Sequence, residues 1–275
     1  MMMNKFLFEQ GWDKNRFIQK LCSMGRISPH FFILGFQKCG TTMLYDQLIK
    51  HPEFKAGLWK ENDELSKRHY DLNKFLLSFP YKRGNLKTGD GSHLYTYAPY
   101  GLPRIKKYFP SSKLLVIMRN PVDRAFSHYN MDIKLGLLNK NITFSNYVDF
   151  EMKILENISD IYSIEELFQG TSIFKNAYGT SVVRGLYSIY MKKMIELGLE
   201  FYPICLERLK NDFENEFSKI IAYLEIEPWK IEMEVVNRGE YKDGLDPATR
   251  TLLSEFYEPF NQQLYALIGD NYDWK

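Results

Sequence analysis

The chain has 275 residues, of which 45% are hydrophobic and 25% charged, so it can bury a sizeable core and has an ordinary globular composition. Its 36 basic and 34 acidic residues give a net charge of +2. This balance excludes the strong overall positive field of proteins that bind nucleic acids or other polyanions through bulk charge. The three cysteines are widely spaced and indicate neither a disulfide framework nor a zinc site, so we expect no metal.

The first 29 residues predict a helical extension that ends at Ser28-Pro29. Its apolar positions are interrupted by charged residues, unlike the continuous apolar core of a signal peptide: Lys5, Glu9, Asp13, Lys14 and Arg16. No segment of the sequence approaches the ~20 apolar residues of a membrane-spanning helix. We therefore expect a soluble, cytoplasmic protein that has neither a membrane nor a nucleic acid as its partner.

An apolar run at residues 31–34 predicts a buried strand, and leucines at helical spacing further on predict a helix. Between them lies a glycine-bearing loop, GFQKCGTT, at residues 35–42. Such a strand–loop–helix unit presents free backbone N–H groups and the positive end of the helix dipole, which together bind a phosphate. The two glycines have the spacing of a nucleotide-binding P-loop. The lysine, however, lies inside the loop as Lys38, and Thr41 occupies the position of the NTPase lysine.

This loop resembles the 5′-phosphosulfate loop of the sulfotransferases that use 3′-phosphoadenosine 5′-phosphosulfate (PAPS). The resemblance implies that Lys38 neutralises the leaving phosphate oxygen, and that backbone N–H groups and hydroxyls of the loop hold the 5′-phosphate. The residues that we expect to contact PAPS here are Gln37, Lys38, Cys39, Gly40, Thr41 and Thr42. Taken alone, so short a match is also compatible with a glycine turn between a core strand and a core helix.

Two later positions are candidates for the base that accepts the proton of the acceptor. In sulfotransferases of the heparan sulfate type a lysine-glutamate pair follows the first helix and its glutamate is the base, and Lys60-Glu61 resembles that pair. Residues 86–93 predict a second strand that enters a glycine-rich loop, and His93 in this segment lies near the point where cytosolic sulfotransferases carry a histidine base. Residue chemistry alone leaves open a solvated charge cluster at Glu61 and a surface histidine at His93. We expect Glu61 to be the base and keep His93 as the second candidate.

Residues 113–119 predict the strongest strand of the chain, which ends at an arginine, and a helix with proline in its first turn follows. The pattern Arg-x-Pro-x-x-Arg-x-x-Ser at residues 119–127 resembles the 3′-phosphate site of the same family. A guanidinium and a hydroxyl in this arrangement can clamp a phosphate dianion, so the resemblance assigns Arg119 and Ser127 to the 3′-phosphate. Arg124, the second arginine of the pattern, could instead brace the helix or pair with an acid.

The rest of the chain is less informative. Residues 143–169 have a charged, helical pattern and could form a variable lid, while residues 184–187 resemble a segment that lines the transfer pocket of the family. Another buried strand is predicted at residues 201–207. Asn237-Arg238-Gly239 resembles a late loop that adds a basic contact to the 3′-phosphate, which implicates Arg238 and Gly239.

Strands that alternate with helices predict one α/β domain at residues 30–275, with a central, mostly parallel sheet flanked by helices, as in the P-loop-like sulfotransferase fold. Ligands are then expected at the carboxyl ends of the strands. The expected reaction is in-line transfer of a sulfuryl group from PAPS to an acceptor oxygen or nitrogen, with Glu61 as the base and without a metal.

The acidic residues near Glu61 would repel a polyanion: Asp63, Glu64 and Asp90. We therefore expect a small neutral or cationic acceptor, such as a natural product of the guanidinium alkaloid class. A glycan sulfotransferase is the alternative within the family. A P-loop kinase or NTPase is disfavoured because Lys38 is misplaced for a γ-phosphate and no strand ends in an obvious magnesium-binding aspartate. A PAPS-binding protein without a base is a third possibility, and the sequence makes no prediction of oligomeric state.

Overall fold

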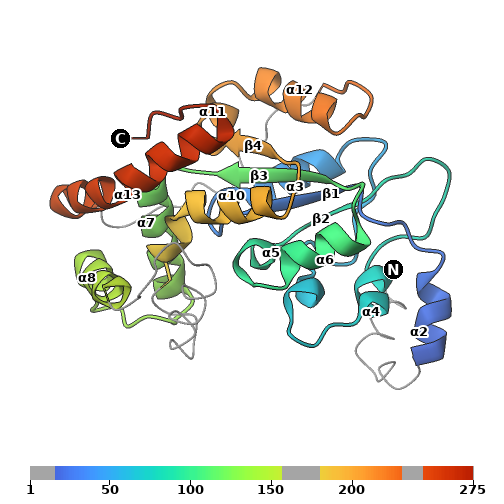
Figure 1. Ribbon diagram of the computed structural model, residues 1–275, viewed down its shortest axis with the longest axis horizontal. Helices are drawn as coiled ribbons and strands as arrows, with labels where there is room; N and C mark the ends of the chain where they lie inside the picture. Colours follow the sequence, from blue (N-terminus) through green and yellow to red (C-terminus); the bar gives the residue numbers. More distant parts are fainter. Residues whose placement is uncertain (1–15, 157–179, 231–243, 275) are drawn as a thin grey trace.

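The computed structural model describes residues 16–156, 180–230 and 244–274 (Figure 1). Its centre is a four-stranded sheet in the order β2-β1-β3-β4, in which every neighbouring pair of strands is parallel. The strands are β1 (Phe31–Gly35), β2 (Gly89–Gly91), β3 (Lys113–Met118) and β4 (Tyr202–Cys205). The predicted α/β class with a mostly parallel sheet is confirmed.

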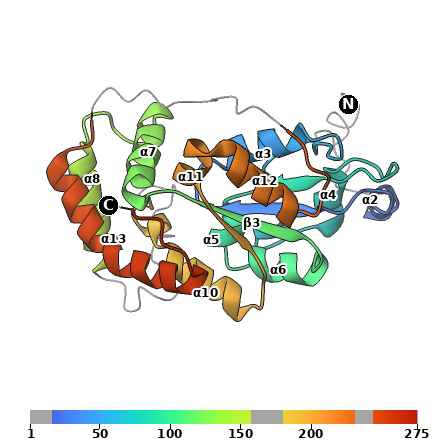
Figure 2. The ribbon, with the colours of Figure 1, turned by 90° about the horizontal axis from the view of Figure 1, so that it is seen from above.

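Helices cover both faces of this sheet, with α3 and α12 on one face and α6 and α10 on the other (Figure 2). In chain order the helices are α2 (Arg16–Ser23), α3 (Thr41–Ile49), η2 (Asp63–Ser66), α4 (Leu72–Leu77), α5 (Leu94–Tyr97), α6 (Gly101–Tyr108), α7 (Pro121–Lys134), α8 (Phe144–Leu155), η3 (Val183–Gly185), α10 (Tyr187–Glu196), α11 (Leu206–Asn211), α12 (Phe213–Tyr223) and α13 (Pro247–Ile268). Because both faces are covered, β1 is buried along its whole length and β3 along all but its first residue. This burial explains why the two strands read as continuous apolar runs in the sequence.

Strand β2 lies within the segment 86–93, for which the sequence predicted a strand and a glycine-rich loop. The residues that pair with β1 are Gly89, Asp90 and Gly91. A glycine is required at the first of these positions, because a Cβ atom on Gly89 would lie 2.2 Å from the Phe31 ring. Only a glycine lets the strand pass so close to that ring.

The described part of the predicted N-terminal extension packs against the main domain. The hydroxyl of Ser23 donates to Asn73 Oδ1 on α4 at 2.9 Å, and Arg26 donates to the carbonyl of Phe79 at 2.7 Å. Of the helices in the described ranges, none combines the length and the apolar character needed to cross a bilayer.

The register of the sheet decides where the sequence motifs meet. Gly35, the last residue of β1, is paired with Ile117 of β3, and Met118 is paired with Cys205 of β4. Three strands therefore end at one edge, and the loop after β1, the start of α7 and the start of α11 lie side by side there. This edge is where ligands bind in sheets of this type.

Candidate active site at the carboxyl ends of the strands

The loop after β1 has an unusual backbone conformation at two residues. Lys38 has a φ of 74° and Gly40 a φ of 90°, both in the left-handed region that L side chains rarely adopt. Gly40 is also the N-cap of α3 and has no side chain to satisfy the first N–H groups of the helix. These N–H groups have no acceptor within the helix, so the loop has the form of an anion-binding helix N-terminus.

Cys39 anchors this loop in the core. Its side chain is fully buried, its Sγ lies 3.6 Å from the Tyr187 hydroxyl, and burial raises the pKa of the thiol to about 11. The backbone N–H of Cys39 donates to the carbonyl of Phe36 at 3.0 Å. The sequence placed Cys39 among the phosphate contacts, but its N–H is engaged within the loop and its thiol points inward.

Gln37 connects the loop to two other segments through hydrogen bonds. Its backbone N–H donates to the Tyr97 hydroxyl at 3.3 Å, and its side-chain oxygen accepts a hydrogen bond from the guanidinium of Arg184. That guanidinium also lies 4.7 Å from the centroid of the Tyr97 ring. The side-chain oxygen of Gln37 is thus used to hold the loop. Arg184, which the sequence associated only loosely with the pocket, is brought to the loop itself.

Lys60 connects the loop to the candidate base. Its ammonium lies 3.0 Å from the Thr42 hydroxyl, 3.5 Å from the Thr41 hydroxyl and 3.3 Å from Glu61 Oε1. The sequence treated Lys60 only as the neighbour of Glu61. The position of Lys60 directly before the candidate base was the sequence signal for a role in the site. Its contact with the loop hydroxyls could not be read from the sequence, because that contact depends on the tertiary structure.

The two candidate bases form one pair. Glu61 Oε2 lies 3.6 Å from His93 Nδ1, and the Glu61 side chain is the more exposed, at 40% against 17% for His93. The hydrogen bond with His93, together with the charges of His93 and Lys60, lowers the pKa of Glu61 to about 2, although partial burial acts in the opposite direction. Glu61 is therefore ionised throughout the physiological pH range, with Oε1 close to the Lys60 ammonium and Oε2 close to the His93 imidazole.

Each of the other carboxylates of this region has a hydrogen-bond or ion-pair partner within the protein. Glu64 is buried and pairs with Lys67 at 2.6 Å. Asp90 is fully buried, accepts a hydrogen bond from the Tyr95 hydroxyl, and has its pKa raised to about 7 by burial. Asp63 accepts a hydrogen bond from the Ser92 hydroxyl. The charge argument for a cationic acceptor counted Glu64 and Asp90 as a negative field, and these two groups do not provide one.

Two of the predicted 3′-phosphate residues lie near the start of α7, one before the helix and one within it. Arg119 follows β3 directly and is half-buried, and its guanidinium has no hydrogen-bond or ion-pair partner among the residues that the structure describes. Ser127 lies two turns into α7 and is buried. Asn120 caps the helix, since its side-chain oxygen accepts from the N–H groups of Val122 and Asp123 at 2.9 and 3.2 Å. Arg238 and Gly239 lie outside the described residues.

The inner face of α7 carries polar residues that the sequence did not single out. His128 and Asp132 are one turn apart and buried, with His128 Nε2 3.7 Å from Asp132 Oδ2. Burial, followed by the charges of Arg184 and Arg124, lowers the pKa of His128 well below its usual value, and burial raises that of Asp132 to about 6. Polar residues repeating every fourth position of a buried helix were the signal that could have identified this face.

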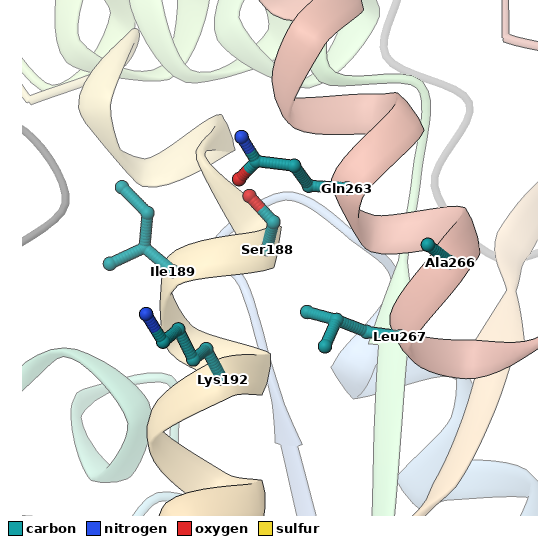
Figure 3. A pocket seen from close by; sticks show the side chains of 6 residues that line it. All are labelled: Ser188, Ile189, Lys192, Gln263, Ala266 and Leu267. Carbon is teal, nitrogen blue, oxygen red and sulfur yellow. The ribbon is translucent and has the colours of Figure 1, made fainter.

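A groove of about 450 Å³ lies between α10 and α13 (Figure 3). Its lining contains none of the residues of the strand-end site: Ser188, Ile189, Lys192, Gln263, Ala266 and Leu267. Within the described ranges, no three His, Cys, Asp or Glu side chains are grouped so that they could hold a metal ion.

Comparison with known proteins identifies related chains. The family model described as "Sulfotransferase domain" matches residues 28–238. Carbohydrate sulfotransferase 15 of Mus musculus is 26% identical over 313 residues, which cover 91% of this chain and 55% of that protein. Heparan sulfate glucosamine 3-O-sulfotransferase 5 of Mus musculus is 24% identical over 278 residues, which cover 90% of this chain and 74% of that protein. The chain thus spans about half the length of the first of these relatives.

Among solved structures, a sulfotransferase from Alicyclobacillus acidocaldarius superposes with a TM-score of 0.69. The two chains share 23% sequence identity, and the alignment covers 89% of this chain and 97% of the other. At this identity the similarity establishes a common fold, in agreement with the parallel sheet and its flanking helices.

Proposed function

Because this chain belongs to the sulfotransferase family, we propose that it transfers the sulfuryl group of PAPS to an acceptor. The observation that carries the proposal is the register of β1 and β3, which brings the loop containing Lys38 beside the start of α7. PAPS has a phosphate at each end of its nucleoside, so two adjacent anion sites suit it. Lys38, Thr41 and Thr42 would bind the 5′ end.

The 3′-phosphate would be bound by the start of α7. Arg119 suits this role because its guanidinium has no partner among the described residues, and Ser127 supplies a hydroxyl further along the helix. Arg238 and Gly239 are proposed as further contacts. No metal ion is needed in this scheme, because positive side chains supply the charge at both phosphates.

In the proposed reaction the bond between sulfur and the 5′-phosphate oxygen breaks, and a bond between sulfur and the acceptor oxygen forms. As in phosphoryl transfer, charge develops on the leaving and equatorial oxygens, so the work of the protein is positioning and charge stabilisation. Lys38 would neutralise the leaving oxygen. Lys60, within 3.5 Å of both loop hydroxyls, would hold the loop and the base in one arrangement.

The proton of the acceptor would pass to the Glu61–His93 pair. We assign the receiving oxygen to Glu61 because its side chain is the more exposed of the two, at 40% against 17%. A carboxylate with a pKa of about 2 is a weak base in the free protein. His93 Nδ1 lies 3.6 Å from Glu61 Oε2, so the imidazole is placed to interact with the carboxylate that receives the proton.

A hydroxyl of a carbohydrate is the acceptor class that we favour. The two related mouse enzymes are named for carbohydrate and for heparan sulfate glucosamine. Around Glu61 the structure has the ammonium of Lys60 and the imidazole of His93, while Glu64 and Asp90 are engaged by Lys67 and Tyr95. A small neutral or cationic acceptor is the second candidate, favoured by Asp63, which lies two residues from Glu61 and is only half-buried.

The first test is calorimetric titration with adenosine 3′,5′-bisphosphate and with ATP, each with and without magnesium. We expect the bisphosphate to bind without magnesium and ATP to bind far more weakly. Tighter binding of magnesium-ATP would instead support a kinase or NTPase.

The second test is transfer of radiolabelled sulfate from PAPS to desulfated glycan oligosaccharides, and to small cationic alcohols and amines. We expect label on the oligosaccharides. Label confined to the small cations would favour the second candidate, and binding of PAPS with no transfer to any acceptor would indicate a binding protein.

A further inference from the structure

Arg124 is an arginine buried completely in the interior of the domain. Its exposed fraction is 0%, and it is among the largest fully buried side chains of the protein. Within the described part of the chain, its Nε and Nη2 atoms have no hydrogen-bond partner. The remaining nitrogen, Nη1, donates to the backbone carbonyl of Gln37 at 3.3 Å. Among the described residues, this buried charge therefore has one hydrogen bond, and the acceptor belongs to the loop after β1.

Among the residues that the structure describes, no carboxylate forms an ion pair with this guanidinium. The groups around it are mainly the thiol of Cys39 and the phenols of three tyrosines: Tyr97, Tyr187 and Tyr257. Asp132 and Glu151 lie within range of its charge, yet burial raises the pKa of both. Glu151 is already engaged by the N–H groups of Ser181 and Val182.

An arginine at this buried position destabilises the folded state, so we expect its charge to serve a function. The guanidinium stays protonated at every accessible pH, and burial of a charge without a paired counter-charge destabilises the folded state. A methionine or leucine could fill the same space in the helix without that penalty. The residue therefore contributes something other than helix packing.

The bond to Gln37 determines the direction of the next N–H group. In a trans peptide the carbonyl and the N–H point in opposite directions. When Arg124 holds the Gln37 carbonyl toward the interior, the N–H of Lys38 is turned toward the outside of the loop. The left-handed φ of 74° at Lys38 belongs to the same turn.

We propose that Arg124 is a positioning residue for the 5′-phosphate. It fixes the loop so that the Lys38 N–H faces the anion, and its charge lies behind the loop and adds to that of Lys38. The anion supplies a counter-charge that the described residues of the free protein do not provide. This inference rests on the proposed function. It gives the second arginine of the motif at residues 119–127 a role at the opposite end of the nucleotide from Arg119.

The test compares Arg124→Met with Arg250→Met. Arg250 is a matched control, because it also contacts α7 but is 41% exposed and pairs with the Asp123 carboxylate at 2.5 Å. For each protein we would measure the unfolding temperature without ligand, and the Kd for adenosine 3′,5′-bisphosphate by calorimetry.

Arg124→Met is expected to keep or raise the unfolding temperature of the free protein and to raise the Kd for the bisphosphate by at least ~10-fold. Arg250→Met is expected to leave this Kd unchanged. The loss should be larger for adenosine 5′-monophosphate than for adenosine 3′-monophosphate. A lower unfolding temperature with an unchanged Kd would show a merely structural role and overturn the proposal.

A second variant, which retains a hydrogen-bond donor at this position, guards against misfolding of Arg124→Met. Arg124→Gln keeps a donor for the Gln37 carbonyl and removes the charge, so a Kd between that of Arg124→Met and that of the unmodified protein supports the proposal, and an unchanged Kd in both variants overturns it. If the unmodified protein does not bind the bisphosphate at all, the proposed function itself fails. If it binds and both Arg124 variants bind equally well, only the role of Arg124 is refuted.

Discussion

Gly40 is the residue on which the shape of the loop between β1 and α3 depends most directly. It has a φ of 90°, and a Cβ atom at this position would lie 2.8 Å from Leu206 Cδ1. Backbone strain and a steric clash therefore act together against any other residue. Leu206 is the first residue of α11, so the clash would also push the loop away from the end of β4.

Gly40→Ala is expected to destabilise the protein by about 1–3 kcal/mol and to weaken bisphosphate binding, as measured by urea unfolding and calorimetry. Gly84→Ala is the matched control, because Gly84 also has a left-handed φ, of 55°, but has no atom within 4 Å of the added Cβ. The control should lose stability and keep its affinity. Equal affinity in the two variants would contradict the role assigned to Gly40.

We expect substitutions in the Glu61–His93 pair to lower the rate of sulfuryl transfer without changing the affinity for the bisphosphate. Glu61→Gln should reduce the rate of sulfuryl transfer by ~10²–10⁴-fold, because the receiving oxygen is lost, while the Kd for the bisphosphate stays the same. His93→Ala should reduce the rate less. Transfer and binding would be measured independently on each variant, and full activity in Glu61→Gln with none in His93→Ala would reverse the assignment.

At the scale of elements, α7 brings the most functional groups together. It starts directly after β3 and carries Arg124 and Ser127 on buried positions. Its cap, Asn120, also donates its backbone N–H to Glu207 of α11 at 3.0 Å, which ties the ends of β3 and β4. The direction of α7 thus depends on a cap that is shared with the neighbouring strand end.

Asn120→Ala removes the acceptor for the N–H groups of Val122 and Asp123. We expect a loss of about 1 kcal/mol in the free energy of unfolding and a weaker bisphosphate complex, because Arg119 is adjacent. Asn120→Ser retains a capping oxygen and should lose less of both. Urea unfolding and calorimetry would measure these changes. Alanine and serine variants with equal losses would show that the cap is unimportant.

For the whole molecule, buried carboxyl groups govern the dependence of stability on pH. Asp90 has a pKa of about 7 in the folded chain, against about 4 for an ordinary aspartate. Between these values the folded protein keeps a proton that the unfolded chain has released, so stability falls as the pH rises through this window. Glu61, with a lowered pKa, has the opposite effect and loses its contribution as the pH falls below the ordinary value for a glutamate.

Asp90→Asn should flatten the decline in stability between about pH 4 and pH 7, by up to ~4 kcal/mol, because the ionisable group is gone. The measurement is the free energy of unfolding in urea at several pH values across this window. An unchanged slope in the variant would show that another group is responsible. Asp132, whose pKa is raised to about 6, would be the next to replace.

Much of the site was predictable because strand–loop–helix units have local signals. Apolar runs predicted β1 and β3, and glycine spacing identified the loop that contains Lys38. What the sequence did not predict were the partners of individual side chains, such as the contact of Gln37 with Arg184 or the inward position of Cys39. These contacts join residues that are distant in the chain, and residue type alone does not specify them.

The sequence by itself determined the principal strands β1 and β3, the motifs and the family, since hydrophobic periodicity and motif spacing are properties of short segments. The tertiary structure alone decided three things. It brought Glu61 and His93 together, it buried Asp90 and paired Glu64 so that neither forms a negative field, and it placed Arg124 behind the loop. The physical reason is the parallel pairing of β1 with β2 on one side and with β3 on the other, because which strands become neighbours depends on burying the whole core at once.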